Sequence, residues 1–168
     1  MPVRRTSRAA AGLTLLESLL AAVLLAAAVS SIVWPFAVCA RNDQVADRST
    51  VAGALVQEMI EEILAQPFDD PQGATELGPE SDENGREDFD NVDDYHGYRE
   101  DAGQITCFDG QTVTGPAAAG LSRSVRAEYA YVQGQDEGAE PSFVAVTVTV
   151  CHGGTAVAEA TRLIYRVQ

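Results

Sequence analysis

The stretch AAAGLTLLESLLAAVLLAAAV, residues 9–29, carries one ionisable side chain, Glu17, inside an otherwise apolar run. A run of this composition predicts a helix that crosses a membrane. An ionised carboxylate in the hydrocarbon of a bilayer costs at least a few kcal/mol unless it finds a partner. The sequence therefore predicts both a membrane helix and a specific partner for the charge of Glu17.

The apolar character continues beyond the quoted stretch. Glu17 is the only charged residue from Leu13 to Ala40, and a helix over these residues would be about 42 Å long at 1.5 Å per residue. We therefore expect a transmembrane helix over 13–40, in which Pro35 bends the helix without ending it. The leader before it, residues 1–12, contains three arginines and no acid, which predicts that this end stays in the cytoplasm.

Residues 41–66 change to an amphipathic pattern. Charged and amide side chains separate apolar ones that recur at intervals of three and four residues, which is the spacing of one helix face. The apolar positions are Val45, Ala52, Leu55, Val56, Met59, Ile60, Ile63 and Leu64. We expect the membrane helix to continue through this range to Gln66, where Pro67 ends it, and its apolar face to pack on a globular domain.

Residues 67–101 form an acidic segment, which holds 13 of the 25 acids, three prolines and four glycines. This composition predicts a long irregular excursion. Four carboxylates in the segment are candidate calcium ligands, because calcium prefers hard oxygen donors. They are Asp88, Asp90, Asp93 and Asp94. Their spacing is not that of an EF-hand, and the alternative is that the acidic run is a solvated surface.

Residues 102–168 have the period-two pattern of an antiparallel sheet, with segments rich in valine, threonine and tyrosine between glycines and prolines. The expected strands lie within 103–110, 121–134, 141–154 and 155–168. In FVAVTVTVC, the four valines from Val144 to Val150 occupy alternate positions, so we expect the valine face to pack on the helix. The sequence HGGT, residues 152–155, predicts a hairpin turn.

The overall charge limits the classes of partner. All 11 basic residues are arginine, and the net charge is −14 at pH 7. This charge repels a phosphate backbone, so we expect no nucleic-acid partner. His96 and His152 each stand alone beside turn residues, and the sequence has no nucleophile motif or phosphate-binding loop. We therefore expect no enzymatic activity, and no cofactor other than the calcium considered above.

The three cysteines lack the C-x-x-C spacing of a zinc or redox site. Cys107 and Cys151 fall in expected strands, whereas Cys39 lies at the end of the membrane segment. An oxidising compartment outside the cytoplasm would permit a disulfide. We predict a bond between Cys107 and Cys151, with Cys39 as the spare thiol.

The residues GLTLLE, 12–17, resemble the N-terminal signal of type IV prepilins and type II secretion pseudopilins. The resemblance consists of a basic leader, a glycine, a glutamate at the fifth place after it and a hydrophobic helix. The family usually has phenylalanine directly after the glycine, where this sequence has Leu13. The layout of the rest of the chain agrees with an α+β pilin-like fold, in which a long N-terminal helix packs on a C-terminal antiparallel sheet.

The resemblance implies a function and a set of partners. A prepilin peptidase would cut between Gly12 and Leu13 and methylate the new amine of Leu13. Glu17 would pair with the N-terminal amine of a neighbouring subunit, which is the partner that its charge requires. The chain would be a structural subunit, a minor pilin or pseudopilin, of a type IV pilus or type II secretion filament. It would span the inner membrane once with its N-terminus cytoplasmic, hold its globular domain in the periplasm or an extracellular filament, and contact other subunits and the inner-membrane assembly platform.

Two alternatives compete with this interpretation. Ala26, Ala27 and Ala28 fit the small-x-small rule for signal peptidase, so the chain could be an exported protein that begins near Val29. Glu17 would interrupt the apolar region of such a signal without any gain. The second alternative is a signal-anchored extracytoplasmic binding domain, calcium-binding in one version, that does not polymerise. The mature N-terminus separates these cases.

Overall fold

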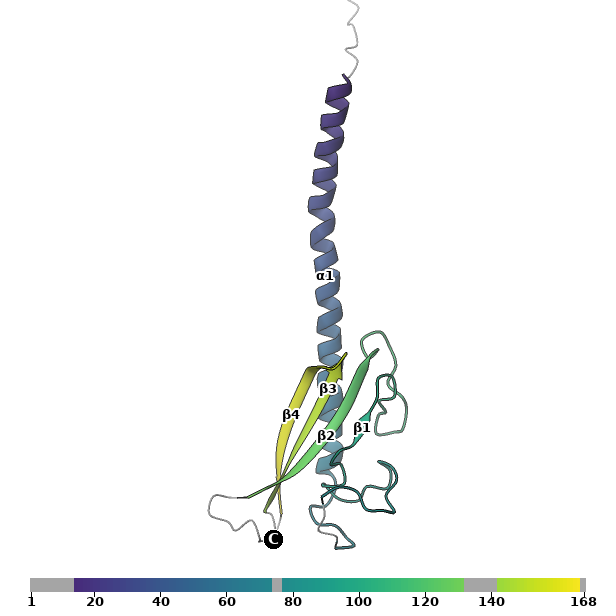
Figure 1. The fold of residues 1–168 in the computed structure, drawn as a ribbon, viewed down its shortest axis with the longest axis vertical. Coiled ribbons are helices and arrows are strands. Elements are labelled where there is room, and N and C mark those ends of the chain that lie inside the picture. The colour runs from purple at the N-terminus through teal and green to yellow at the C-terminus, as the bar shows by residue number, and fades with distance from the viewer. Residues whose placement is uncertain (1–13, 74–76, 132–141, 167–168) are drawn as a thin grey trace, which may run out of the picture. The chain divides into compact units, whose positions relative to one another are not determined.

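The computed structural model describes residues 14–73, 77–131 and 142–166 (Figure 1). The chain divides into two compact units, Met1–Asp43 and Gln44–Gln168. One helix, α1 (Leu15–Leu64), runs through both units. The strands all belong to the second unit and are β1 (Arg99–Glu100), β2 (Leu121–Ala130), β3 (Phe143–His152) and β4 (Thr155–Tyr165). The coarse prediction, an α+β chain with a long N-terminal helix and an antiparallel sheet, is confirmed.

The helix α1 is continuous over the ranges predicted to be its membrane half and its amphipathic half. It is 50 residues long and contains Pro35, which does not end it. The helix ends at Leu64, two residues before the predicted end. The amide groups of Ala65 and Gln66 still donate to carbonyls three residues earlier, both at 3.1 Å. Such tighter bonds are usual at a helix end, and Pro67 follows without an N–H to continue them.

The four strands form an antiparallel meander in the order β1, β2, β3, β4 (Figure 1). Gly153 and Gly154 join β3 to β4, and His152 pairs with Thr155 across the turn. Both glycines have positive φ angles, 57° and 81°, as the central residues of a type I′ hairpin turn require. The predicted HGGT turn is therefore confirmed.

The sheet differs from the prediction at its first edge. Residues 103–110, expected to be a strand, contribute only an isolated bridge between Thr106 and Thr112. The pairing stays short because the chain turns back at Gly110, whose N–H donates to the carbonyl of Cys107 at 2.9 Å. The edge strand is instead β1, two residues inside the segment that was expected to be irregular.

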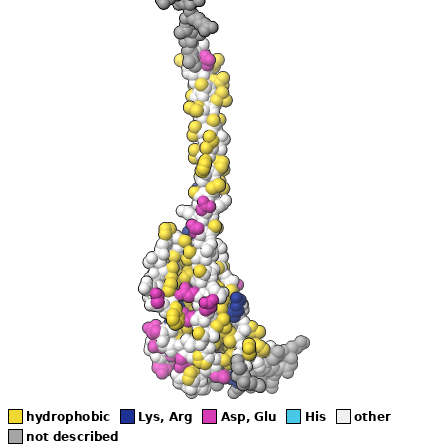
Figure 2. Space-filling model, turned by 180° about the vertical axis from the view of Figure 1, so that it is seen from behind, with side chains coloured by type: hydrophobic (Ala, Val, Ile, Leu, Met, Phe, Trp, Pro, Cys, Tyr) yellow, Lys and Arg dark blue, Asp and Glu magenta, His cyan; other side chains and the backbone are white. Residues whose placement is uncertain are grey.

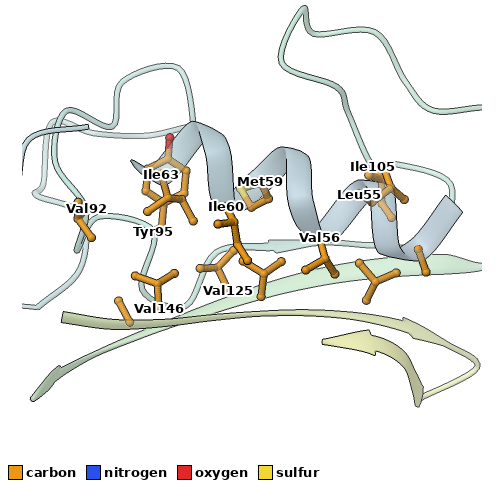
Figure 3. Close-up of a cluster of buried hydrophobic side chains, with 14 of the residues drawn as sticks. Leu55, Val56, Met59, Ile60, Ile63, Val92, Tyr95, Ile105, Val125 and Val146 are labelled. Atoms are coloured by element: carbon orange, nitrogen blue, oxygen red, sulfur yellow. The ribbon is translucent and has the colours of Figure 1, made fainter. Parts of the chain in front are cut away.

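The core of the second unit lies between α1 and one face of the sheet (Figure 3). Val56 and Ile60 point from the helix toward the sheet, where Val125 of β2 lies. The four valines of β3, from Val144 to Val150, are at most 1% exposed, so the predicted valine face is confirmed. Fully burying a side chain of this kind contributes about 1.5–3 kcal/mol, so this layer stabilises the unit.

The acidic segment takes part in the same core and is not a wholly solvated excursion. Val92 and Tyr95 are at most 1% exposed and belong to the same buried cluster as Ile63 of α1 (Figure 3). The rings of Phe89 and Tyr98 meet Tyr95 edge to face, with centroids 5.0 and 6.5 Å away. Irregular backbone between α1 and β1 is thus fixed in place by aromatic side chains.

Candidate functional site

Glu17 lies in the first turn of α1, three residues after Thr14. The backbone N–H of Glu17 donates to Oγ1 of Thr14 at 3.2 Å, which makes Thr14 the N-cap of the helix. The pair has the T-x-x-E spacing of a capping box, a signal in the sequence that the prediction overlooked. The positive end of the helix dipole also favours a carboxylate in the first turn.

The part of α1 that precedes Asp43 is apolar and exposed. Figure 2 shows hydrophobic side chains in yellow along this part of the helix. Its large side chains are 51–87% exposed from Leu15 to Phe36. Among the described residues, α1 is the one helix long and apolar enough to cross a membrane. A surface of this extent requires a bilayer or another apolar partner.

The predicted processing residues, Gly12 and Leu13, lie outside the described residues. No protein-family model, curated protein or solved structure matches the chain.

The predicted disulfide between Cys107 and Cys151 is not formed in the structure. All three cysteines, Cys39, Cys107 and Cys151, are free thiols. Cys151 pairs with Ser122 of β2 and lies on the face of β3 opposite the buried valines. Cys107 lies after β1 on the side of the helix, where burial and the charge of Glu58 raise the pKa of its thiol. The two thiols thus lie on opposite sides of the sheet, which explains why they do not pair.

The four predicted calcium ligands do not come together. Asp88 accepts a hydrogen bond from a backbone N–H four residues earlier, at 3.2 Å. Asp90 accepts from Nε2 of Gln72 at 2.9 Å, and Asp93 accepts from the hydroxyl of Tyr129 at 3.0 Å. Of the four, only Asp94 belongs to a group of carboxylates whose oxygens lie close together among the described residues.

That group, the acidic cluster, consists of Glu80, Glu83 and Asp94, whose ligand oxygens all lie within 4.8 Å of one another. A turn places the two glutamates, because the N–H of Glu83 donates to the carbonyl of Glu80 at 3.1 Å. The N–H of Glu80 in turn donates to Oε2 of Glu83 at 3.0 Å. Asp94 comes from a second turn, where its Oδ2 accepts from the N–H groups of Asp90 and Asn91 at 2.9 and 2.8 Å.

Burial and mutual repulsion raise pKa values in the acidic cluster. Partial burial raises the pKa of Glu80 to about 7, and hydrogen bonds with Glu83 and Asp70 add to the rise. Burial raises the pKa of Asp94 to about 6, although two backbone hydrogen bonds oppose the rise. Carboxylates this close repel one another unless a proton or a cation lies among them.

A second polar group, the buried ion chain, was not predicted from the sequence. Arg123 is 1% exposed on the inner face of β2. Its Nε donates to Oε2 of Glu100 at 2.5 Å, and its other two nitrogens donate to the carbonyls of Leu55 at 3.1 Å and Thr106 at 2.8 Å. Each nitrogen of the guanidinium therefore has a hydrogen-bond partner, and the charge faces a carboxylate, as a buried charge requires.

Arg86 extends the chain of charges toward α1. Its Nε donates to Oε1 of Glu62 at 2.6 Å, and its Nη1 lies 3.6 Å from Oε1 of Glu100. The order Glu62, Arg86, Glu100, Arg123 alternates acid and base and connects the helix, the acidic segment, β1 and β2. Because each charge faces an opposite charge, we interpret this group as a structural support of the fold.

Proposed function

We propose that the chain is a structural subunit, a minor pilin or pseudopilin, of a type IV pilus or type II secretion filament. The observation that carries the proposal is the exposed apolar part of α1 with Glu17 as its only charge between Leu15 and Ala40. Before assembly this surface would rest in the inner membrane. In the filament the same surface would pack against the helices of neighbouring subunits.

The charge of Glu17 supports assembly more than simple anchoring. An anchor gains nothing from a carboxylate in hydrocarbon, which costs at least a few kcal/mol. Cleavage after Gly12 would create a cationic amine on Leu13, and opposite charges attract strongly where water is excluded. A bond from Glu17 to the amine of an adjacent subunit would also set the axial offset between the two helices.

The second unit supports the proposal by giving each subunit a compact head. Its sheet covers the face of α1 from Ala52 to Ile63, so the amphipathic half of the helix is already buried within one subunit. The membrane half remains for contacts with other subunits and with an assembly platform in the inner membrane. A head of this kind would lie in the periplasm or on the outside of a filament.

The first test concerns processing. In cells with an active prepilin peptidase, we expect a mature chain that begins at Leu13 and carries a methylated amine, as measured by mass spectrometry of the N-terminal peptide. Gly12→Val should leave the precursor uncut, because the added side chain would prevent the scissile bond from entering the peptidase. Ala11→Val adds comparable bulk one position earlier and should still be cut.

Two outcomes would contradict the proposal. A mature chain that begins near Val29 would identify an ordinary secretory signal that is removed by signal peptidase. An intact N-terminus at Met1 in those cells would identify a permanent anchor, and the second unit would then be a tethered binding domain that does not polymerise.

A further inference from the structure

We propose that Asn84 is a site of spontaneous covalent modification, at which its side-chain amide is converted to an acid and part of the product is isoaspartate. The proposal does not rest on the filament function, because it follows from the chemistry of one turn. Asn84 is followed by Gly85 in the acidic segment. The Asn-Gly sequence is the least hindered for this reaction, because glycine places no side chain beside the attacking backbone nitrogen.

The reaction needs only water and involves no oxidant or reductant. The backbone nitrogen of Gly85 loses its proton to the solvent and attacks Cγ of Asn84. The new C–N bond closes a succinimide ring, and the bond from Cγ to Nδ2 breaks, so that Nδ2 leaves as ammonia after taking a proton from water. Water then adds to one of the two ring carbonyls. One opening gives aspartate, and the other gives isoaspartate, in which the backbone runs through the former side chain.

The attacking nitrogen is available in the structure. Among the described residues, no acceptor binds the N–H of Gly85, although the carbonyl of this residue accepts from the N–H of Asp88 at 2.8 Å. A nitrogen engaged as a donor would have to break its hydrogen bond before it could lose its proton. Gly85 therefore meets the first requirement of ring closure without any local unfolding.

The side chain of Asn84 is also open to attack. It is exposed, whereas the residues on either side of it are half-buried. Its Nδ2 donates to the carbonyl of Asp82 at 3.1 Å, a surface hydrogen bond that water can replace. The side chain can therefore rotate until its Cγ faces the backbone nitrogen of Gly85.

The other two asparagines of the chain lack these properties. Asn91 is 1% exposed, and its Oδ1 accepts from two backbone N–H groups at 2.7 and 3.3 Å. The nitrogen that would attack Asn91, that of Val92, already donates to the carbonyl of Pro67 at 3.1 Å. Asn42 lies within α1, where each backbone N–H donates to a carbonyl four residues earlier. The structure therefore leaves one asparagine of the three ready to react.

The products would disturb the buried ion chain, because Asn84 lies two residues before Arg86. The guanidinium of Arg86 binds Oε1 of Glu62 at 2.6 Å and the carbonyl of Thr106 at 3.0 Å. Isoaspartate adds one atom to the backbone just before this arginine, which moves the chain that positions it. Either product also adds a negative charge next to Glu83. We therefore expect the ion chain to loosen as the protein ages.

The test incubates the full-length protein in an uncharged detergent at mildly alkaline pH, with and without urea, and samples it over time. Trypsin cuts after arginine, so it places Asn42, Asn84 and Asn91 in three separate peptides for mass spectrometry. The Asn84 peptide should gain about one dalton and split into an aspartate form and an isoaspartate form. In the folded protein it should convert at least about tenfold faster than either of the other two peptides.

Gly85→Ala is the variant that separates the chemistry from the fold. The φ angle of Gly85 is not positive, and the nearest atoms to an added Cβ belong to the exposed side chain of Glu87, which can move. The variant should fold like the wild type but convert at least about tenfold more slowly, because its methyl group hinders ring closure. Asn84→Gln should not convert on the same timescale, because glutamine would have to form a larger ring.

The proposal is wrong if Asn84 converts in urea but stays intact in the folded protein, because the turn would then protect it. It is also wrong if Asn42 or Asn91 converts as fast as Asn84, or if Gly85→Ala converts at the wild-type rate. The melting temperature of the converted wild type should fall, while that of Asn84→Gln after the same incubation should not. An unchanged melting temperature in fully converted protein would exclude the effect on the buried ion chain.

Discussion

Replacing Arg123 with methionine should lower the free energy of unfolding by about 3–5 kcal/mol, the usual cost of breaking a buried ion pair by removing one partner. The carboxylate of Glu100 is 7% exposed and would lose the guanidinium that binds its Oε2 at 2.5 Å. The carbonyls of Leu55 and Thr106 would each lose a donor as well. Urea unfolding of the full-length protein in an uncharged detergent, followed by near-UV circular dichroism of the buried tyrosines, measures this loss.

Two further variants isolate the buried charge as the cause. Arg126→Met removes an arginine from the same strand, where the side chain is 64% exposed and lies 3.5 Å from Glu128. Its effect should stay below about 1 kcal/mol, as for other exposed pairs. Adding Glu100→Gln to Arg123→Met should restore part of the loss, because the buried charge disappears while an amide oxygen still accepts from Thr106. Equal losses for Arg123→Met and Arg126→Met would contradict the importance of the buried ion chain.

The contribution of Glu100 to stability should depend on pH with opposite signs in the wild type and in Arg123→Met. Burial alone would raise the pKa of Glu100, but hydrogen bonds from Arg123 and Thr106 outweigh it and hold the pKa below its ordinary value. In the wild type the stability from this carboxylate is therefore present above the unfolded-state pKa and is lost as pH falls. In Arg123→Met, burial should raise the pKa, so stability should increase as pH falls. The deficit of the variant should shrink between about pH 7 and about pH 4, and a constant deficit would contradict this account.

The regular elements of the fold could be predicted because their patterns are local. The interval of three and four residues in 41–66 gives the buried face of α1, except that Val45 and Leu64 are 62% and 49% exposed. The alternation in 143–150 gives the valine face of β3. The edge strand β1 could not be predicted in this way. Arg99 and Glu100 have no strand pattern, and they extend only because β2, more than 20 residues later, offers hydrogen bonds.

The polar groups were harder to predict, for two different reasons. Arg123 is in phase with Leu121 and Val125, so alternation alone could have placed it on the buried face and indicated a buried acid as its partner. The acidic cluster carries no such signal. The side chains of Asp90 and Asp94 are close along the chain, but the carboxylate of Asp90 binds Gln72 and stays outside the cluster. Glu80 and Asp94 are brought together by two turns whose geometry does not show in the sequence.

Replacing Glu17 with glutamine should reduce incorporation into filaments by at least about tenfold, which corresponds to losing only 1.4 kcal/mol of pairing energy. Glutamine keeps the size of the side chain and is equally suited to the third position of a capping box after Thr14. The helix start should therefore persist, and insertion and cleavage after Gly12 should stay at wild-type levels. The unassembled variant should even be more stable in lipid, because the buried carboxylate is gone.

The measurement compares, in one culture, the fraction of precursor that is cut and the fraction of mature protein in sheared filaments. Thr14→Val is the matched control, because it removes the oxygen that caps the N–H of Glu17 at 3.2 Å but keeps the carboxylate. It should weaken the helix end by about 0.5–2 kcal/mol without blocking assembly. If Glu17→Gln assembles normally while Thr14→Val does not, the role of Glu17 is limited to capping the helix. If Glu17→Gln is no longer cut, its charge serves the peptidase. Normal cutting together with lost incorporation, in Glu17→Gln alone, is the result expected of a carboxylate that binds the amine of the next subunit.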